Sequence, residues 1–250
     1  MADRGPNAGR VAYQSLAVFY DDFTAGYRAD AWTGRLEALA AAHDIPSRRL
    51  LDVGCGTGKS FLPMLDRGWE VVGCDVSPAM LEIAREKVGD TVRLEVADAR
   101  NLPILGEFGL VWALNDTLNY LLSSDEMKAA LEGMRANLAP GGTLLFDLNT
   151  LATFRSDFAT EASRDGMTWT GQESADVEPG SICEARFEVE GDLEATHVHR
   201  QRHFPEAEVL ETIAAAGLTC LETWGDYEGE QEQPLDEGRH QKAIYVIKIT

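Results

Sequence analysis

The sequence predicts an α/β fold: a doubly wound, mostly parallel seven-stranded sheet with an inserted antiparallel β segment. Three observations predict it. The apolar run Leu50–Val53 leads directly into closely spaced glycines, which is typical of a buried strand that turns sharply into a helix. Strand-like and helical stretches alternate from Arg48 to Asn149. After Asn149 the sequence becomes rich in β-like alternation and turn residues.

Composition limits the partners that we expect. The formal net charge of −20 would repel a phosphate backbone, so we expect no nucleic-acid partner. No apolar stretch is long enough for a membrane span, and the amino terminus lacks the apolar centre of a signal peptide. The four cysteines form no C-x-x-C pair and are typical of reduced thiols. We therefore expect a cytoplasmic protein that binds neither nucleic acid nor membranes.

Two amphipathic helices are predicted before the central strand, at Val11–Phe19 and Ala29–His43. Ile45-Pro46 ends the second one. After the central strand and its glycines, we expect a helix to begin near Lys59, with its free N–H groups directed at a ligand on the glycine loop.

The next part of the chain predicts the rest of the parallel sheet. Ser77-Pro78 predicts a helix start, because serine caps a helix and proline suits its first position. Gly89 ends that helix, and a further helix spans Asp125–Leu138. The remaining strands of this part are predicted at Trp69–Asp75, Thr91–Ala97, Phe108–Leu114 and Thr143–Asn149.

The last hundred residues predict an antiparallel cap and the closing elements of the sheet. Cap strands are expected at Thr168–Glu173, Ser181–Val189 and Glu194–Phe204; a helix at Pro205–Ala216; closing strands at Leu218–Tyr227 and Gln241–Ile249; and a loop at Glu228–Gly238. The chain then divides into an N-terminal helical segment or lid (1–47), a core (48–150 with 205–250), and a β-rich cap over the acceptor site (151–204).

The glycine loop fits one of three nucleotide-binding patterns best. The dinucleotide fingerprint needs glycine where Lys59 stands. The phosphate-binding loop ends in Gly-Lys-Ser, as here, but needs glycine where Val53 stands. A D-x-G-x-G-x-G turn fits fully. Turning alone does not require glycines at three alternate positions. The residues of this turn are Asp52, Gly54, Gly56 and Gly58.

Polar side chains recur at the carboxyl ends of the predicted strands, where ligands of such sheets bind. Asp75 suits the two hydroxyls of a ribose, since Ser77 already supplies the helix cap. Asp98-Ala99 suits an adenine amino group, although aspartate is also common in surface turns. The full set is Asp52, Asp75, Asp98, Asn115 and Asp147.

These residues resemble the motifs of class I S-adenosylmethionine (SAM)-dependent methyltransferases, from the glycine turn to the Pro140-Gly141-Gly142 turn. Within that superfamily the chain is similar to small-molecule enzymes with inserted antiparallel strands, including sugar-amine N-methyltransferases of antibiotic pathways. Three segments carry this second likeness: Tyr20-Asp21 with Tyr27 and Trp32; Asp116-x-x-Asn119-Tyr120-Leu121; and His199-x-Gln201-Arg202-x-Phe204.

The resemblance implies a Rossmann-like methyltransferase fold with SAM as cofactor and S-adenosylhomocysteine as product. It implies Asp75 on the ribose, Asp98 near the adenine, and the loop glycines beside the methionyl part. The implied cofactor-binding residues are Tyr20, Asp52, Gly54, Cys55, Gly56, Gly58, Asp75, Val76, Asp98, Ala99, Leu114 and Asn115.

On the acceptor side, we expect His199, Tyr27 and Asp116 to be catalytic, because a methyl acceptor must be oriented and relieved of a proton. The unperturbed pKa of histidine, near 6.5, suits proton transfer at neutral pH. His197, His199 and His203 share a strand face, but no further ligand is evident, so no metal is expected. The expected substrate-binding residues are Asn119, Asp147, Asn149 and Arg202.

The sequence therefore predicts a SAM-dependent methyltransferase of a small molecule, with an amine acceptor favoured over a hydroxyl or carboxylate. The alternatives are an O-methyltransferase, a phosphate-loop nucleotide hydrolase using Lys59 and Ser60, and a SAM-binding protein without catalysis.

Overall fold

The computed structural model describes residues 8–156, 158, 161–172 and 177–249. Its helices are α1 (Ala8–Phe23), α2 (Ala29–Ala41), α3 (Leu62–Asp66), α4 (Pro78–Val88), α5 (Ser124–Arg135), α6 (Leu151–Arg155) and α7 (Glu206–Ala215). Its strands are β1 (Arg49–Val53), β2 (Glu70–Asp75), β3 (Arg93–Val96), β4 (Phe108–Ala113), β5 (Leu138–Asn149), β6 (Glu161–Arg164), β7 (Met167–Gly171), β8 (Ile182–Val189), β9 (Asp192–Arg202), β10 (Leu218–Tyr227), β11 (Glu230–Glu232) and β12 (Lys242–Ile249).

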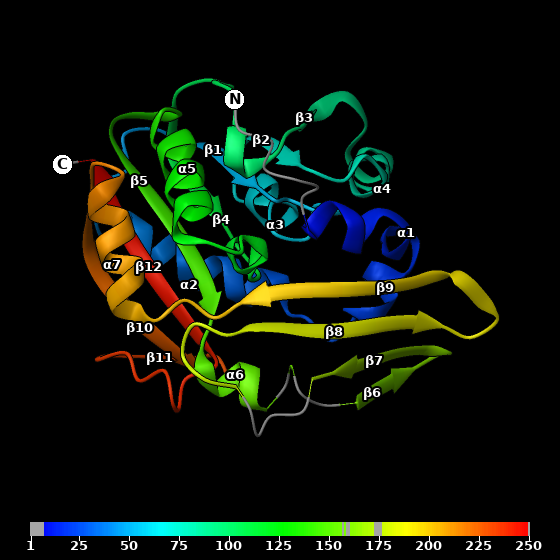
Figure 1. Cartoon of the computed structure of the whole chain (residues 1–250). Coiled ribbons are helices and arrows are strands. Elements are labelled where there is room, and N and C mark those ends of the chain that lie inside the picture. Colours follow the sequence, from blue (N-terminus) through cyan, green and yellow to red (C-terminus); the bar gives the residue numbers. More distant parts are fainter. Residues whose placement is uncertain (1–7, 157, 159–160, 173–176, 250) are drawn as a thin grey trace.

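These strands form two sheets (Figure 1). The large sheet has the order β11-β10-β12-β5-β4-β1-β2-β3, and the small sheet has the order β6-β7-β8-β9. Strands β1 to β5 run parallel to one another, whereas β12 is antiparallel to both β5 and β10. The predicted doubly wound, mostly parallel sheet with an antiparallel insertion is confirmed.

Helices cover both faces of the large sheet, because successive residues of a strand point to opposite faces. Leu50 belongs to the cluster formed with α2, α3 and α4. Leu51, next in the chain, belongs to the cluster formed with α5 and α7. A strand buried on both faces must be apolar at every position, which explains the continuous run that precedes the glycines.

The structure corrects four of the predicted boundaries. No helix begins at Lys59: the loop glycines take positive φ angles, so α3 begins only at Leu62. Strand β5 begins at Leu138 rather than Thr143, because Leu138 already pairs with β4. The third correction concerns the start of the cap segment, where Leu151–Arg155 is helical and Glu161–Arg164 adds a strand.

The fourth correction concerns the acidic stretch 228–238, which was predicted to be a loop. Three of its residues form β11, which pairs antiparallel with the end of β10, Gly225 opposite Glu232. The large sheet therefore has eight strands rather than seven. The predicted strand at Thr168–Glu173 is observed as Met167–Gly171, and Glu173 lies outside the described residues.

Helix α1 lies between the two sheets (Figure 1). It packs against β9 on one side and α4 on the other. Apolar side chains of α1 meet the small sheet, as in the edge-to-face contact of Phe23 with Phe187, 5.2 Å between ring centroids. The insertion and the N-terminal helix therefore form one packed unit above the carboxyl ends of β1, β2 and β4.

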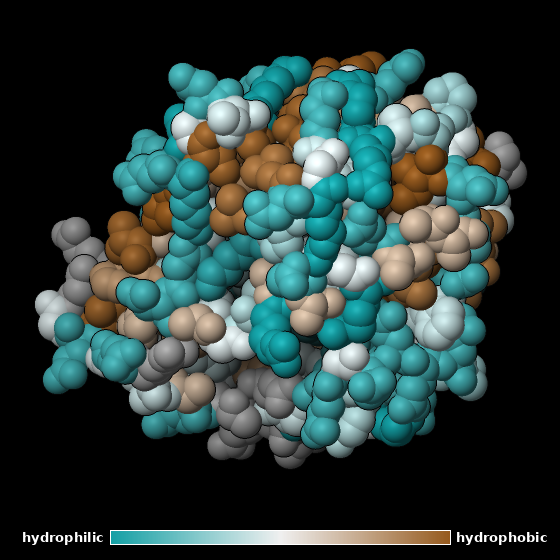
Figure 2. Space-filling view, turned by 180° about the vertical axis from the view of Figure 1, so that it is seen from behind, coloured by the Kyte–Doolittle hydropathy of each residue, from teal (hydrophilic) through white to brown (hydrophobic). Residues whose placement is uncertain are grey.

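Hydrophilic residues cover much of the back of the molecule, and hydrophobic ones form separate groups there (Figure 2). This agrees with the strong excess of acidic residues. Among the described residues, no helix is both long enough and apolar enough to span a membrane.

Candidate active site

A pocket lies at the carboxyl ends of β1, β2 and β4, with about 810 Å³ of empty space when the open solvent at its mouth is included. Its walls come from α1, the glycine loop, the ends of β2 and β3, and the segment after β4. The lining residues are Gly9, Tyr13, Tyr20, Val53, Gly54, Cys55, Gly56, Thr57, Lys59, Ser60, Asp75, Val76, Met80, Ala97, Ala99, Leu114, Asn115, Thr117, Tyr120 and Leu121.

The glycine loop can approach this pocket because its first glycine has no side chain. Gly54 has φ +75°, and a Cβ there would lie 2.4 Å from Cγ2 of Thr117. The Gly54 and Cys55 N–H groups both donate to the Cys74 carbonyl, at 2.8 and 3.0 Å. The loop is thus folded back onto β2, with its backbone against the pocket.

Asp52 lies beneath the loop and does not line the pocket. It is 1% exposed and accepts a hydrogen bond from Ser60 Oγ at 2.5 Å. Burial raises the pKa of this carboxyl to about 7. Asp52 therefore anchors the far side of the loop rather than contacting its contents.

Asp75 lines the pocket and is 8% exposed. Its Oδ2 accepts the Gly56 N–H and its Oδ1 the Ser77 N–H, each at 2.8 Å. Two carboxylate oxygens provide about four acceptor positions, so capacity remains for ligand hydroxyls. The predicted cap is confirmed: Ser77 Oγ accepts the Met80 N–H at 3.4 Å. Asp75 thus supports both the loop and α4 while facing the pocket.

At the end of β3, the two predicted cofactor residues differ in position. Ala99 lines the pocket together with Ala97. The Asp98 carboxylate accepts from the Arg100 guanidinium at 2.8 Å and from the Arg100 N–H at 2.9 Å, and it is not among the lining residues. The alanines therefore provide an apolar surface, and Asp98 fixes the turn beside it.

Most of the predicted cofactor-side residues meet at this pocket. Those that line it are Tyr20, Gly54, Cys55, Gly56, Asp75, Val76, Ala99, Leu114 and Asn115. Those that stand behind the lining are Asp52, Gly58 and Asp98.

Three tyrosines form the wall opposite the glycine loop. The hydroxyl oxygens of Tyr13 and Tyr120 lie 2.9 Å apart, and the Tyr120 hydroxyl lies 2.8 Å from His199 Nδ1. Tyr13 and Tyr20 are in edge contact, with ring centroids 5.8 Å apart. Burial raises the pKa of all three phenols, so they remain protonated and uncharged at neutral pH.

His199 lies behind Tyr120 rather than in the pocket lining. It is 1% exposed, and the rings of Tyr13 and Trp169 lie within 5.4 and 5.0 Å of its centroid. The expectation of a pKa near 6.5 is wrong: burial, and then the nearby His197, lower the pKa to about 3. The imidazole is neutral, and it contacts the hydroxyl of Tyr120, which lines the pocket.

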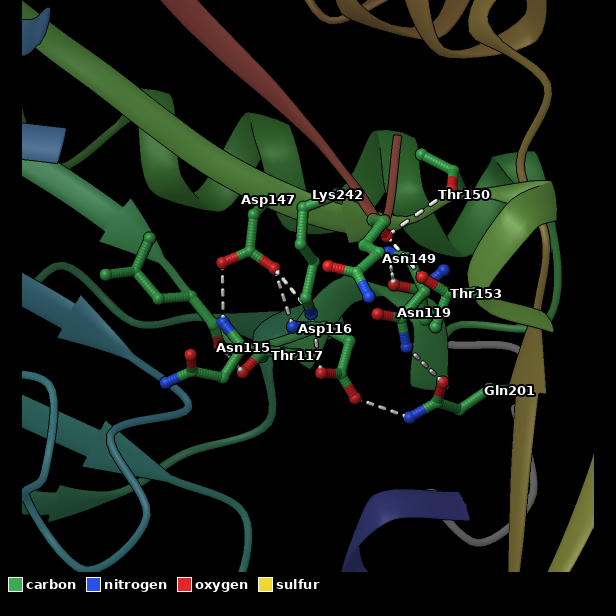
Figure 3. Close-up of polar contacts among 12 residues, drawn as sticks. Asn115, Asp116, Thr117, Asn119, Asp147, Asn149, Thr150, Thr153, Gln201 and Lys242 are labelled. Atoms are coloured by element: carbon green, nitrogen blue, oxygen red, sulfur yellow. Dashed lines mark hydrogen bonds and ion pairs between the residues drawn. The ribbon is translucent and has the colours of Figure 1, made fainter. Parts of the chain in front are cut away.

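Asp147, a predicted substrate residue, is completely buried beside the pocket (Figure 3). It accepts the N–H groups of Asn115 and Asp116 at 2.7 and 2.8 Å. Both of these residues have φ +57°, a left-handed conformation that Asn and Asp tolerate better than most other side chains. Asp147 stabilises this turn, which shapes the pocket wall at Asn115 and Thr117.

Lys242 neutralises the acids of this turn (Figure 3). Its ammonium lies 2.9 Å from Asp116 Oδ1 and 3.2 Å from Asp147 Oδ1. Burial alone would lower the pKa of Lys242, but the two carboxylates outweigh burial and raise it. The cluster therefore holds two carboxylates and one cation.

A chain of amide hydrogen bonds connects this cluster to β9 of the small sheet. Gln201 donates to Asp116 Oδ2 at 2.6 Å and accepts from Asn149 at 3.0 Å. Asn119 donates to the Arg202 carbonyl and accepts the Asn149 N–H, each at 2.9 Å. The predicted residues Asn119, Asp147 and Asn149 thus lie together, and the hydrogen bonds of Asn119 and Asn149 connect the large sheet to the small one.

The side chains of the other two predicted acceptor-side residues, Arg202 and Tyr27, take no part in the amide chain. The Arg202 guanidinium pairs with Glu208 at 2.7 Å and lies 4.5 Å from the centroid of the Phe204 ring. The Tyr27 hydroxyl is buried, and burial and then Asp147 raise its pKa. Because β8 and β9 pair without a shift between His199 and Arg202, these two side chains lie on opposite faces of β9.

Sequence reasoning missed Tyr13, Thr117 and Lys242. A signal existed for Tyr13, which lies seven residues before Tyr20, about two helical turns, so both rings share one face of α1. No local signal marks Lys242. In the part of the chain that the structure describes, no group of three metal-ligating side chains is placed to hold a metal ion.

Comparisons with known proteins agree with this geometry. A family profile described as a methyltransferase domain matches residues 50–142. YqeM of Bacillus subtilis is 28% identical over 245 residues, 93% of this chain and 97% of that protein. The dTDP-3-amino-3,6-dideoxy-alpha-D-glucopyranose N,N-dimethyltransferase of Streptomyces fradiae is 30% identical over 235 residues, 88% of this chain and 90% of that enzyme.

Among solved structures, a SAM-dependent methyltransferase from Clostridium acetobutylicum superposes with a TM-score of 0.76 at 21% identity, covering 95% of this chain and 98% of that one. The pocket fits SAM: it has a backbone cradle at Gly54, a carboxylate with free acceptor capacity at Asp75, and an apolar surface at Ala97 and Ala99. The chain belongs to the class I SAM-dependent methyltransferases.

Proposed function

We propose that this methyltransferase methylates a nitrogen of a small-molecule amine, and that the amine is carried by a sugar. The observation that carries the proposal is the likeness, over 90% of its length, to the Streptomyces fradiae enzyme, whose name gives a nucleotide-linked amino sugar as its substrate. The same proposal assigns the ribose hydroxyls of SAM to Asp75 and its adenine to the surface of Ala97 and Ala99.

The polar groups of the pocket wall support an amine over a carboxylate acceptor. The wall opposite the glycine loop consists of uncharged phenols. The lysine that lines the pocket, Lys59, already donates to two backbone carbonyls and one hydroxyl. A carboxylate acceptor would therefore enter without a free ammonium to hold it.

The three tyrosines suit a reaction in which positive charge moves from sulfur to nitrogen. SAM supplies a methyl group on a sulfonium, and the acceptor attacks in line with its lone pair. Faces of aromatic rings attract cations, so Tyr13, Tyr20 and Tyr120 stabilise positive charge on either side of the transfer. Rigid placement of the acceptor supplies most of the remaining catalysis, because alignment alone can contribute about 7–11 kcal/mol.

The roles of the predicted catalytic residues follow from their contacts. We assign His199 to the orientation of the Tyr120 hydroxyl, which then accepts a hydrogen bond from the acceptor N–H. Asp116 and Tyr27 act on the shape of the wall, since Asp116 is bonded to Lys242 and Gln201 and the Tyr27 hydroxyl is buried near Asp147. The methylated ammonium releases its proton to water after transfer.

The contact of β9 with Tyr120 also supports the division of the chain into an N-terminal lid (1–47), a SAM-binding core (48–150 with 205–250) and an acceptor-facing cap (151–204). In this division the cap determines which acceptors fit, and the core holds the cofactor.

The experiment compares matched acceptors. The enzyme is incubated with SAM and a nucleotide-linked amino sugar, with the same sugar bearing a hydroxyl in place of the amine, and with the free amino sugar. Formation of S-adenosylhomocysteine and the product mass are measured. We expect the amine to be methylated and the hydroxyl analogue to be inert. Methylation of the hydroxyl analogue with an inert amine would show an O-methyltransferase and overturn the proposal.

A further inference from the structure

Lys59 occupies the position that distinguishes this glycine loop, directly after Gly58, and its ammonium is directed at the end of α1. Nζ lies 3.0 Å from the Asp21 carbonyl, 3.0 Å from the Thr24 carbonyl and 2.6 Å from Thr24 Oγ1. An ammonium has three N–H donors, so these three acceptors use its full capacity. Lys59 is therefore not free to bind a phosphate group.

These contacts complete the carboxyl end of α1. The last carbonyls of a helix lack intrahelical partners and carry a partial negative charge, which a cation stabilises. Helix α1 has no basic residue in its last turn, and Lys59 of the glycine loop supplies the cation at this helix end. The Lys59 ammonium also lies 5.8 Å from the centroid of the Tyr20 ring, the last aromatic of α1 in the pocket wall.

Asp21 provides a second connection at the same end of α1. Its Oδ1 accepts from Thr57 Oγ1 at 2.7 Å, and its Oδ2 lies 2.5 Å from the ammonium of Lys87 on α4. Lys87 in turn donates to the Thr57 carbonyl at 2.8 Å. One carboxylate thus connects α1 both to the glycine loop and to the helix behind that loop.

Both connected elements are walls of the SAM pocket. Helix α1 supplies Gly9, Tyr13 and Tyr20, and the loop supplies the residues from Gly54 to Ser60 that line it. We propose that Lys59 is a positioning residue: with Asp21, it latches α1 to the glycine loop and keeps α1 closed across bound SAM.

The proposal predicts where the latch acts in the catalytic cycle. SAM bound in this pocket would lie between the two walls, so a weakened latch would allow α1 to move away and SAM to leave sooner. The aromatic wall re-forms whenever α1 closes, so the chemical step at saturating SAM changes less than the KM for SAM does.

The test uses Lys59→Met, which keeps the apolar stem and removes the charge and the three donors, and Lys59→Arg, which restores a cation. Dissociation of radiolabelled SAM is followed by rapid filtration, and amide hydrogen exchange of α1 is followed by mass spectrometry. For Lys59→Met we expect dissociation to accelerate about tenfold, the effect of losing a charge-assisted contact. We also expect faster exchange in α1 and no change in β4. Lys59→Arg should recover most of the loss.

The matched control is Lys128→Met on α5, whose ammonium pairs with Glu132 far from the pocket. This variant should dissociate SAM at the wild-type rate. Wild-type dissociation and wild-type α1 exchange in Lys59→Met would overturn the proposal, as would exchange that rises equally in α1 and β4, because that result marks a general loss of stability. If Lys59→Met does not fold, Asp21→Asn and Thr24→Val weaken the same latch from its other side and must give the same pattern.

Discussion

The Tyr120 hydroxyl and His199 Nδ1 lie 2.8 Å apart, and this contact bonds the tyrosine wall directly to β9 of the small sheet. Because the Tyr13 hydroxyl lies 2.9 Å from that of Tyr120, one chain of hydrogen bonds connects α1, the segment after β4, and β9. A substitution in the cap can therefore move the pocket wall without touching a ligand.

His199→Gln should change the pH dependence of stability. The pKa of His199 is about 3 in the folded protein, below the 6.5 of an unfolded chain, so the unfolded state binds the extra proton between these values. Wild-type stability should then fall with decreasing pH by up to about 1.4 kcal/mol per pH unit across that window, relative to the variant. Urea denaturation of both proteins from pH 7 to pH 4 measures the difference, and parallel curves would contradict the prediction.

Asp52→Asn should reveal a pH dependence of stability with the opposite sign to that of His199. The pKa of Asp52 is raised to about 7, so the folded state holds a proton that an unfolded chain loses near pH 3.9. The stabilisation is complete below about pH 3.9 and is lost as the pH rises through 7. Asparagine cannot ionise. As the pH rises through this window, the free energy of unfolding of the variant should therefore increase relative to that of the wild type by up to about 1.4 kcal/mol per pH unit. A stability difference that stays constant with pH would refute this.

Asp75→Ala should weaken SAM binding by about 1.5–3 kcal/mol, the range for hydrogen bonds to a charged group. The carboxylate also accepts the Gly56 and Ser77 N–H groups, so the control is Ser77→Ala, which removes only the helix cap. Calorimetric titration with SAM should separate the two variants clearly. Equal affinities would mean that Asp75 acts only as a support for the loop and α4.

Lys242→Met should destabilise the protein by about 3 kcal/mol, because it leaves the Asp116 and Asp147 carboxylates without their cation. This is the low end of the range for buried pairs, since the Lys242 side chain is 22% exposed. Adding Asp116→Asn should recover part of the loss. Chemical denaturation measures both variants, with Lys248→Met as the control, which removes a hydrogen bond to the Gly141 carbonyl near the end of β12. If Lys242→Met lowers the free energy of unfolding no more than Lys248→Met does, the cluster of Lys242, Asp116 and Asp147 contributes little to stability.

Local sequence patterns were sufficient to predict the doubly wound core, the glycine loop and the Ser77 cap, because each depends on neighbours in the chain. Leu50–Val53 is buried on both faces and therefore continuously apolar, and Ser77 finds its donor three residues on, at Met80. The resemblance to the methyltransferase family, carried by these local motifs, implied nine residues that line the pocket.

Tertiary structure alone decided what those residues do. Lys242 meets Asp116 across 126 positions of the chain, His199 meets Tyr120 across 79, and Lys59 meets Thr24 across 35. Such contacts depend on the order of strands in the sheet and on where the cap packs, which no local pattern encodes. Burial then reversed the chemistry expected from residue type: it lowered the pKa of His199 and raised that of Asp52, because a charge loses its hydration inside the fold.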